Sequence, residues 1–326
     1  MGMNRKRCLV TGGAGFIGSH LAERLLDLGH EVAIVDNFYR EALCDRPKLP
    51  GPLPLIKGST ADKQLMDAII PEFDVVFHLA AILGVKTTMT RPVEMIEANV
   101  EGTRNVLAAA YRSGCKVVFA SSSEVYGKGT PPFAEENDRV YGATAKLRWI
   151  YAVAKTLEET LCLGYGDKGL PVTILRYFNI YGPRAKEGPY AGVIPRFIRA
   201  ALAGNDLLVY GDGTQTRCFT YVSDAVEATA RAVDPKADQE ILNVGSAHQT
   251  SIGALAVLVK RLTGSSSRIV NVPFEQVYSF GFEEIPNRFP DMRKTKRILD
   301  FSARIGLEEG LARTIDWYRA RGGERG

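Results

Sequence analysis

The stretch RCLVTGGAGFIGSH, residues 7–20, decides the fold. It reads as a short apolar strand, a turn rich in glycine and the start of a helix with regularly spaced leucines. This order brings free backbone N–H groups and the positive end of a helix dipole to one point, where a pyrophosphate can bind. The GxxGxxG spacing therefore predicts a dinucleotide cradle built by Gly12, Gly15, Phe16, Ile17 and Gly18.

Further strands and helices alternate along the chain from this point. Apolar strands are predicted over 31–36, 74–81, 116–123 and 171–182, with helices over 19–29 and 92–114 between some of them. Short buried strands that alternate with amphipathic helices indicate a parallel sheet with helices on both faces. We therefore expect an α/β fold, a Rossmann-type doubly wound parallel sheet with a smaller C-terminal α/β lobe.

The expected division places the dinucleotide-binding domain at residues 1–182. The pattern loosens after residue 183, so residues 183–326 are expected to form mainly a substrate-binding lobe. The chain is expected to return to the main sheet near 215–245. Asp36 ends the second strand, where a carboxylate accepts hydrogen bonds from both ribose hydroxyls and repels a 2′-phosphate. This position favours NAD over NADP as the cofactor.

The bulk composition narrows the function class. The chain has 326 residues and a net charge of +4, with its basic residues scattered, so we expect no nucleic-acid partner. The longest apolar stretch is too short to span a bilayer, so no membrane partner is expected. The cysteines are dispersed, which indicates reduced thiols in the cytoplasm and predicts no metal site. The five cysteines are Cys8, Cys44, Cys115, Cys162 and Cys218.

A catalytic group is predicted after the strand that ends in SSSEVYG, residues 121–127. The segment YAVAK follows, with Tyr151 and Lys155 on one face of a helix, four residues apart. A phenol is a weak base at neutral pH, and an adjacent ammonium stabilises its phenolate form. Tyr151 is therefore a candidate general base, with Ser122 and Glu124 as further catalytic candidates.

Five motifs in order resemble the extended short-chain dehydrogenase/reductase family of nucleotide-sugar epimerases, dehydratases and decarboxylases. They are TGGAGFIGSH (11–20), SSSEVYG (121–127), YAVAK (151–155), RYFNIYGPR (176–184) and GDGTQTRCFTYVSD (211–224). The resemblance implies that Tyr151 takes a proton from a sugar hydroxyl while NAD+ takes hydride from the same carbon. It also implies that Lys155 holds the nicotinamide ribose and that Ser122 binds the reacting oxygen.

The resemblance further implies two sets of contacts. Besides the cradle, Asp36, Tyr151 and Lys155, the residues expected to contact NAD are Asn37, Asp62, Leu79, Ala80, Ala81, Asn99 and Tyr177. In similar proteins an acid often contacts the adenine where this chain has Ser59. The residues expected to contact a UDP-sugar are Ser123, Asn179, Arg184, Val193, Arg217 and Arg288.

Residue 123 separates the subclasses of this family. Dehydratases resembling this chain have an aspartate there, and Ser123 cannot replace it as an acid. The Ser-Ser-Glu run, KLRWIYAVAK (146–155) and RFPDMRKTK (288–296) resemble UDP-glucuronate decarboxylases that form UDP-xylose through a 4-keto sugar. The segment 80–103 is more similar to UDP-hexose or UDP-hexuronate 4-epimerases, which remain the alternative. A non-catalytic NAD-binding sensor is a more distant one.

Three further expectations concern single residues and assembly. Arg148 lies one helical turn before Tyr151, where it can reach a substrate carboxylate or pair with a nearby acid. Glu124 is expected to act on the sugar or to hold a neighbouring hydroxyl. His78 is expected to be a hydrogen-bonded residue at a strand end rather than a catalyst. The resemblance also implies a homodimer through the helices near 92–114 and 145–165.

Overall fold

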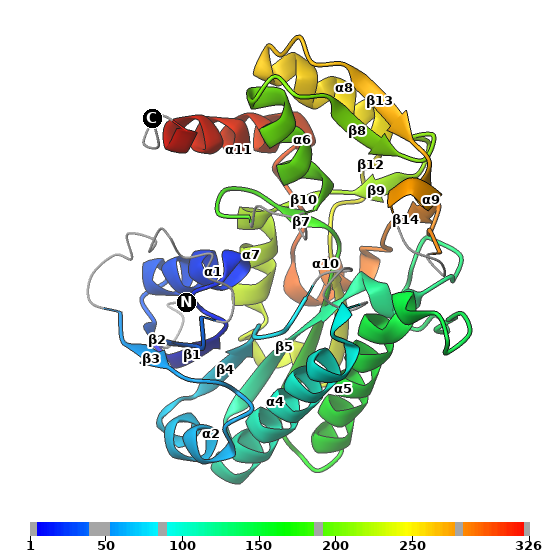
Figure 1. Cartoon of the computed structure of the whole chain (residues 1–326). Coiled ribbons are helices and arrows are strands. Elements are labelled where there is room, and N and C mark those ends of the chain that lie inside the picture. The colour runs from blue at the N-terminus through cyan, green and yellow to red at the C-terminus, as the bar shows by residue number, and fades with distance from the viewer. Residues whose placement is uncertain (1–4, 39–52, 84–89, 186–191, 278–282, 323–326) are drawn as a thin grey trace.

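A seven-stranded parallel sheet forms the centre of the molecule (Figure 1). The computed structural model describes residues 5–38, 53–83, 90–185, 192–277 and 283–322, so Cys44 and part of segment 80–103 lie outside the described residues. The strand order is β11-β6-β5-β4-β1-β2-β3. The strands are β1 (Arg7–Thr11), β2 (Glu31–Asp36), β3 (Leu55–Lys57), β4 (Val75–His78), β5 (Lys116–Ser122), β6 (Val172–Tyr177) and β11 (Glu240–Val244).

Helices cover both faces of this sheet, as expected for a doubly wound fold. On one face α1 (Phe16–Asp27) packs against α7 (Val222–Arg231). On the other face α4 (Pro92–Ser113) packs against α5 (Ile150–Gly166) and α2 (Lys63–Ile69). Because both faces are covered, the central strands are apolar throughout, and this confirms the fold class.

The first turn of the chain forms as its sequence predicts. In β1 the side chains of Cys8, Leu9 and Val10 are fully buried. In α1 the buried positions Leu21 and Leu25 lie one turn apart, so one stripe of the helix packs on the sheet. The element pair therefore buries its apolar side chains and leaves the turn between them at the carboxyl end of β1.

The strand order reverses between β1 and β4. Strands β2 and β3 lie on one side of β1, whereas β4, β5, β6 and β11 follow on the other. At such a point the two connections leave the sheet in opposite directions and open a crevice beyond the carboxyl ends of the strands. Thr11 and His78 are the last residues of β1 and β4, so the crevice begins at these two residues.

The prediction of a single strand over 171–182 is wrong, because the structure has two strands there. The first part is β6, and the second is β7 (Ile180–Tyr181), which pairs with β10 (Thr220–Tyr221) in a separate sheet. Asn179 lies between them with φ of 43°. A residue in this left-handed region cannot continue a strand, so the chain turns away from the main sheet here.

The C-terminal lobe contains small sheets and helices at the top of Figure 1. Strand β9 (Thr216–Cys218) lies between β12 (Gln249–Ser251) and β14 (Asn287–Arg288), and β8 (Leu207–Tyr210) pairs with β13 (Ile269–Val272). The larger helices of the lobe are α6 (Val193–Leu202), α8 (Ile252–Thr263) and α11 (Leu307–Gly322), and α9 (Phe274–Val277) is a short one. The short helix α10 (Arg293–Leu299) instead packs against β11 of the main sheet.

Short 3-10 helices connect several of these elements. They are η1 (Ile70–Glu72), η2 (Ser123–Tyr126), η3 (Leu147–Trp149) and η4 (Pro235–Ala237). Two of them, η2 and η3, carry or adjoin the residues expected to be catalytic. Over the described residues, no helix has the length and apolar character that crossing a membrane requires.

Candidate active site

The glycine turn after β1 has the shape that a dinucleotide requires. Gly12 has φ of +68°, and a Cβ atom there would lie 2.9 Å from the backbone of Ala80. A Cβ atom on Gly18 would lie 2.2 Å from the carbonyl oxygen of Gly12. Gly15 is the N-cap of helix α1 and makes no side-chain cap, so no capping side chain accepts from the N–H groups of the first turn. These residues fit the pyrophosphate of NAD.

Asp36 lies at the end of β2, beside this turn. Its carboxylate accepts hydrogen bonds from the backbone N–H groups of Ala14, at 3.1 Å, and Phe38, at 2.8 Å. Burial raises the pKa of Asp36, and the two N–H groups oppose that rise. The backbone thus fixes the carboxylate at the rim of the cradle, next to Asn37, where the resemblance predicts a contact with the adenosine ribose.

The loop after β4 forms the other wall of the crevice. The backbone N–H of Leu79 donates to the carbonyl of Thr11, and that of Ala80 donates to the Thr11 hydroxyl, both over 3.2 Å. The amide of Asn99 accepts from the backbone N–H of Ile82 at 2.7 Å and donates to its carbonyl at 3.1 Å. Asn99 therefore shapes the segment that contains Ala81 by binding its backbone.

Two other residues expected to contact NAD use their polar groups within the protein. Asp62 caps helix α2, because its side chain accepts from the backbone N–H of Leu65 at 3.0 Å. The hydroxyl of Tyr177, at the end of β6, lies 2.7 Å from that of Thr229 on α7. Their contacts with NAD stay predictions, as do those of the other expected residues.

The catalytic candidates gather where β5 ends. Ser122 is the last residue of β5, and its hydroxyl accepts from the backbone N–H of Glu124 at 3.2 Å. Ser123 follows in η2 and is buried. Tyr151 lies in the first turn of α5, which packs against β5 and η2. The fold therefore brings two segments that are distant in sequence to one end of the sheet.

Lys155 points into the protein from the same helix as Tyr151, as the spacing predicts. Its side chain is almost fully buried, and Nζ lies 4.5 Å from the ring centroid of Phe119. Nζ donates to the carbonyl of Ala120 at 3.1 Å and to Oε2 of Glu158 at 3.2 Å. The ammonium is therefore held by β5 on one side and by its own helix on the other.

Glu124 lies between two guanidinium groups. One carboxylate oxygen is 2.7 Å from Nη1 of Arg148, and the other accepts from Nη1 of Arg288 at 2.5 Å. Burial acts to raise the pKa of Glu124, but Arg288 and Arg148 together hold that pKa well below its usual value. Of the two alternatives for Arg148, the structure has the pairing with a nearby acid. The Ser122 hydroxyl is bound by the Glu124 backbone, not by its carboxylate.

A third guanidinium lies beside this pair. Arg217 in β9 is the register partner of Arg288 in β14, and it forms an ion pair with Glu284. Burial, followed by the nearby charge of Arg288, lowers the pKa of Arg217. The three arginines are more buried than surface arginines usually are, which indicates a site prepared for an anionic molecule.

The remaining residues expected to bind substrate are placed in three different ways. The amide of Asn179 donates to the carbonyl of Cys218 at 3.0 Å, next to Arg217. Val193 opens helix α6 and is partly buried. Arg184 turns toward α1, where it donates to Glu23 at 2.8 Å and to the hydroxyl of Ser19 at 3.3 Å. Their contacts with substrate stay predictions.

Sequence reasoning missed two carboxylates of the site. Glu158 follows Lys155 by three residues, so helical spacing alone placed both on one face of α5. Glu284 had no such signal, because its partner Arg217 is 67 residues away in the sequence. His78, in contrast, is bonded to two hydroxyls as expected, those of Thr11 and Thr103.

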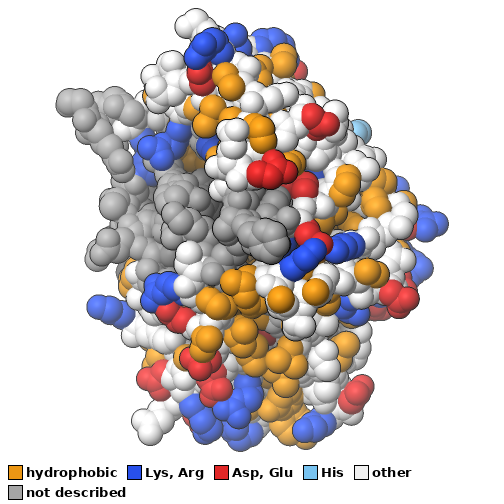
Figure 2. All heavy atoms as spheres, turned by 45° about the vertical axis from the view of Figure 1, so that its right-hand side comes forward, with side chains coloured by type: hydrophobic (Ala, Val, Ile, Leu, Met, Phe, Trp, Pro, Cys, Tyr) orange, Lys and Arg blue, Asp and Glu red, His pale blue; other side chains and the backbone are white. Residues whose placement is uncertain are grey.

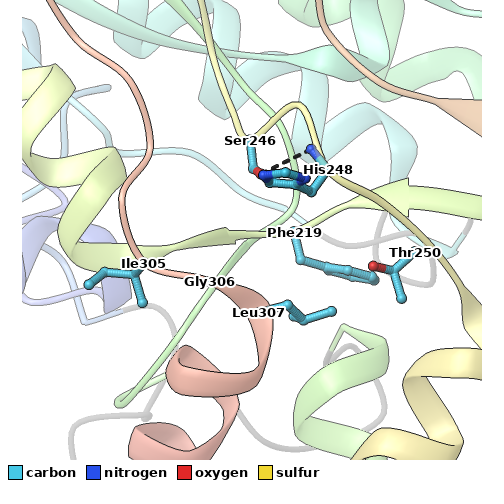
Figure 3. Close-up of a pocket in the computed structure, with 7 residues that line it drawn as sticks. All are labelled: Phe219, Ser246, His248, Thr250, Ile305, Gly306 and Leu307. Carbon is cyan, nitrogen blue, oxygen red and sulfur yellow. Dashed lines mark hydrogen bonds between the residues drawn. The ribbon is translucent and has the colours of Figure 1, made fainter.

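A separate cavity of about 260 Å³ lies between β12 and the start of α11 (Figure 3). Within it the backbone N–H of His248 donates to the hydroxyl of Ser246 at 3.2 Å. The side chains of Phe219, Thr250 and Leu307 lie together on the other side. The lining residues include no lysine, arginine, aspartate or glutamate: Phe219, Ser246, His248, Thr250, Ile305, Gly306 and Leu307.

Comparison with known proteins agrees with this geometry. A curated protein of Bacillus cytotoxicus, named UDP-N-acetyl-alpha-D-glucosaminuronate decarboxylase, is 64% identical over 315 residues, covering 97% of this chain and 98% of that protein. The structure of MoeE5 with UDP-glucuronic acid and NAD is 35% identical with a TM-score of 0.81, covering 97% of this chain and 99% of the other. The Thermotoga maritima UDP-glucose 4-epimerase, with UDP-glucose, is 30% identical with a TM-score of 0.86 and the same coverage.

The family model described as the NAD dependent epimerase/dehydratase family matches residues 8–245. That match begins in β1, includes the glycine turn, Ser122, Tyr151 and Lys155, and ends just after β11. The cradle, the acid at the end of β2 and the Tyr-Lys pair are thus all within it. The chain is an enzyme of the NAD dependent epimerase/dehydratase family, an extended short-chain dehydrogenase/reductase whose cofactor is NAD.

Proposed function

We propose that this enzyme decarboxylates a UDP-linked uronate, with UDP-N-acetylglucosaminuronate as its sugar nucleotide. The observation that carries the proposal is the half-buried carboxylate of Glu124 between Arg148 and Arg288, with Arg217 beside them. Three guanidinium groups exceed the two carboxylates, Glu124 and Glu284, that they pair with. An incoming diphosphate or uronate carboxylate would compensate the remaining positive charge.

The chemistry of a uronate explains the residues present. Bound NAD+ would accept hydride from C4 of the sugar and return it at the end. Tyr151 would take the C4 hydroxyl proton, with the ammonium of Lys155 stabilising the phenolate and the Ser122 hydroxyl binding O4. The ketone at C4 is then β to the carboxylate, so the C5–C6 bond breaks, CO2 leaves and its electron pair moves toward O4.

The arginines would act on the carboxylate during this step. They would place the C6 carboxylate, while Glu124 offsets part of their charge. If the arginines paired with the C6 carboxylate at full strength, they would stabilise the substrate before CO2 leaves and so oppose the reaction. The resulting enolate would collect its charge on O4, next to Ser122 and Tyr151, and C5 would take a proton from water. Tyr151 would then give its proton back to O4 as hydride returns to C4.

The choice of sugar follows the likeness to the protein of Bacillus cytotoxicus. The protein of Bacillus cytotoxicus is 64% identical over nearly the full length of both chains, and its name gives an N-acetylated uronate. The MoeE5 structure with UDP-glucuronic acid is 35% identical. An N-acetyl group at C2 takes no part in the bonds that change at C4 to C6, so the same catalytic residues serve either sugar.

The test is incubation of the purified enzyme and NAD+ with UDP-N-acetylglucosaminuronate or UDP-glucuronate in parallel. We expect CO2 release from the first, a UDP-linked N-acetylamino-pentose by mass spectrometry and NMR, and a lower kcat/KM for the second. A Tyr151→Phe variant with intact NAD content should release no CO2. A product that retains the carboxylate and is inverted at C4 would replace the decarboxylase with the epimerase that the Thermotoga maritima likeness favours.

We also propose how the chain divides its work between two lobes. Residues 1–182 would bind NAD and residues 183–326 mainly the sugar nucleotide, supported by the position of Arg217 and Arg288 in the small sheet. A cytoplasmic location is part of the proposal. The described cysteines, which are all unpaired and buried, support a reducing compartment: Cys8, Cys115, Cys162 and Cys218.

A homodimer through α4 and α5 completes the proposal. Figure 2 shows hydrophobic side chains gathered over the lower half of one face, where these helices lie. On α4, Val93 is 64% exposed and Tyr111 is 44% exposed; on α5, the values are 49% for Val153 and 47% for Leu157. A contiguous apolar surface of this kind is typical of an interface, and two copies of one helix pair present the same surface to each other.

A further inference from the structure

We propose that Glu158 is a positioning residue of the active site. It keeps the ammonium of Lys155 charged and in the position from which it acts on Tyr151. It does so at one end of a buried hydrogen-bond chain that begins at the dinucleotide turn. The inference rests on the role given to Lys155 in the proposed function. Glu158 is 0% exposed, and its Oε2 lies 3.2 Å from Nζ of Lys155.

The chain passes through two helices and two strands. Oε2 of Glu158 accepts from the hydroxyl of Thr103 on α4 at 2.7 Å. That hydroxyl lies 3.0 Å from Nε2 of His78, and Nδ1 of His78 lies 2.7 Å from the hydroxyl of Thr11. The Thr11 hydroxyl in turn accepts from the backbone N–H of Ala80 at 3.2 Å.

The direction of donation follows once the imidazole of His78 is neutral. Burial, followed by the charge of Lys155, lowers the pKa of His78 to about 3, so the ring carries one proton. A carboxylate accepts, so Thr103 donates its proton to Glu158 and accepts from Nε2–H of His78. Nδ1 of His78 then accepts from the Thr11 hydroxyl, whose oxygen accepts from the backbone N–H of Ala80.

The surroundings of Lys155 give Glu158 this role. From β5, the ammonium meets the ring of Phe119 and the carbonyl of Ala120, neither of which carries a charge. From β4, it faces His78, whose pKa burial lowers, so that this ring is neutral. Among the described residues, the ionisable groups that share its helix and neighbourhood are the partly buried Tyr151 and the buried Glu158, Glu159 and Cys162.

Glu159 is paired with other groups, so Glu158 supplies the negative charge that balances the ammonium of Lys155. Glu159 forms a bidentate pair with Arg176 at 2.9 and 2.8 Å and also accepts from Arg139 and Ser121. Burial raises the pKa of Cys162 well above its usual value, so it stays a neutral thiol. Without the carboxylate of Glu158, the buried side chain of Lys155 would face only uncharged groups, and a buried charge without a partner is costly.

The test follows Lys155 directly by NMR in the NAD-loaded protein, without any sugar nucleotide. Its ¹³Cε resonance is assigned by its loss in Lys155→Met, and its titration is compared between the parent and Glu158→Gln. We expect the midpoint in Glu158→Gln to lie at least about one pH unit lower. An unchanged midpoint in a folded variant would overturn the proposal and leave Glu158 a packing residue. Since no sugar is used, a wrong choice of reaction does not affect this result.

A matched pair at Thr103 tests the chain itself. Thr103→Ser keeps the hydroxyl that donates to Glu158, whereas Thr103→Val removes it and keeps the shape. We expect the serine variant to titrate like the parent and the valine variant to shift in the same direction as Glu158→Gln, by less. Where turnover is measurable, the basic limb of the kcat profile should move to lower pH with Glu158→Gln. A fall in kcat with both limbs unmoved would contradict the proposal.

Discussion

Glu124 differs from an ordinary active-site carboxylate because its charge is already shared between two arginines. Its oxygens lie 2.7 Å from Arg148 and 2.5 Å from Arg288, so it cannot easily take up a proton. A group of this kind is suited to balancing charge and placing the arginines rather than to transferring protons. Its contribution is therefore best tested by removing the charge while keeping the shape.

We predict that Glu124→Gln slows turnover at least about tenfold, which corresponds to ~1.4 kcal/mol of barrier. The amide no longer offsets the two guanidiniums, so the substrate carboxylate is held too firmly. Bound NAD, measured after denaturation, should be unchanged, because Glu124 does not line the glycine turn. Glu308→Gln, an exposed glutamate paired with Arg261, serves as the control and should match the parent. Parental kinetics in Glu124→Gln would exclude the residue from the mechanism.

His78 makes a separate prediction about stability and pH. Its pKa is about 3 in the folded protein against an ordinary 6.5, so between these values the unfolded chain binds a proton that the folded protein does not. Its contribution to stability is therefore complete above about pH 6.5 and is lost as the pH falls toward 3. The slope for one proton is ~1.4 kcal/mol per pH unit.

Replacing this histidine should flatten the acid side of the stability curve. We expect His78→Gln to be less stable than the parent at neutral pH but to lose stability less steeply between about pH 6.5 and 4. The measurement is the unfolding free energy at several pH values. His248→Gln, at an exposed histidine, should keep the parental slope. An equally steep slope in His78→Gln would assign the acid sensitivity to other groups.

At the scale of elements, the contact between the glycine turn and helix α1 sets the geometry of the cofactor site. A Cβ atom at Gly18 would lie 2.2 Å from the carbonyl oxygen of Gly12 and 2.8 Å from the backbone of Gly13. Backbone cannot move aside as a flexible side chain can. Any side chain at residue 18 must therefore displace the start of α1 from the turn, and with it the N–H groups that a pyrophosphate would use.

We predict that Gly18→Ala loses about 1–3 kcal/mol of stability through this overlap and retains less NAD after purification. Gly164→Ala in α5 is the matched control, since a Cβ atom there meets nothing within 4 Å. It should gain up to about 1 kcal/mol, because alanine is the better helix former. The measurements are thermal unfolding and cofactor content. Equal behaviour of the two variants would show that the turn tolerates a side chain.

The elements that local pattern predicted well are those whose burial repeats along the chain. Strand β1, the glycine turn, α1 and the helix that carries Tyr151 and Lys155 follow from apolar spacing and glycine positions alone. The break at Asn179 could not be foreseen in this way. Its φ of 43° is imposed by pairing of β7 with β10, which begins about 40 residues later in the chain.

The ion pairs of the site could not be predicted from local sequence either. Glu124 and Arg288 are 164 residues apart, and the sequence names both as candidates without indicating that they bind each other. Only the fold brings β14 over the end of β5, and only then do Arg148 and Arg217 acquire their neighbours. Residue type and motif thus indicate which side chains are candidates, and the tertiary arrangement decides how their charges balance.

At the scale of the whole molecule, the apolar surface of α4 and α5 is the feature that a single copy leaves unexplained. Val153 and Leu157 are one turn apart on α5 and nearly half exposed, on the side of the helix away from buried Lys155. On α4 the exposed side chains include Val93, Ile96 and Tyr111. Because α4 and α5 also carry Thr103 and Tyr151, an interface here would brace the helices that hold the catalytic group.

We predict that the parent is a dimer by light scattering and that Leu157→Asp is a monomer at the same concentration, since a carboxylate buried at the interface without a partner is costly. The matched control is Val257→Asp on α8, where the parent side chain is 58% exposed and lies in the other lobe. It should remain a dimer, and both variants should keep their NAD. A monomeric parent would refute the dimer, and a dimeric Leu157→Asp with a dissociated Val257→Asp would move the interface to the C-terminal lobe.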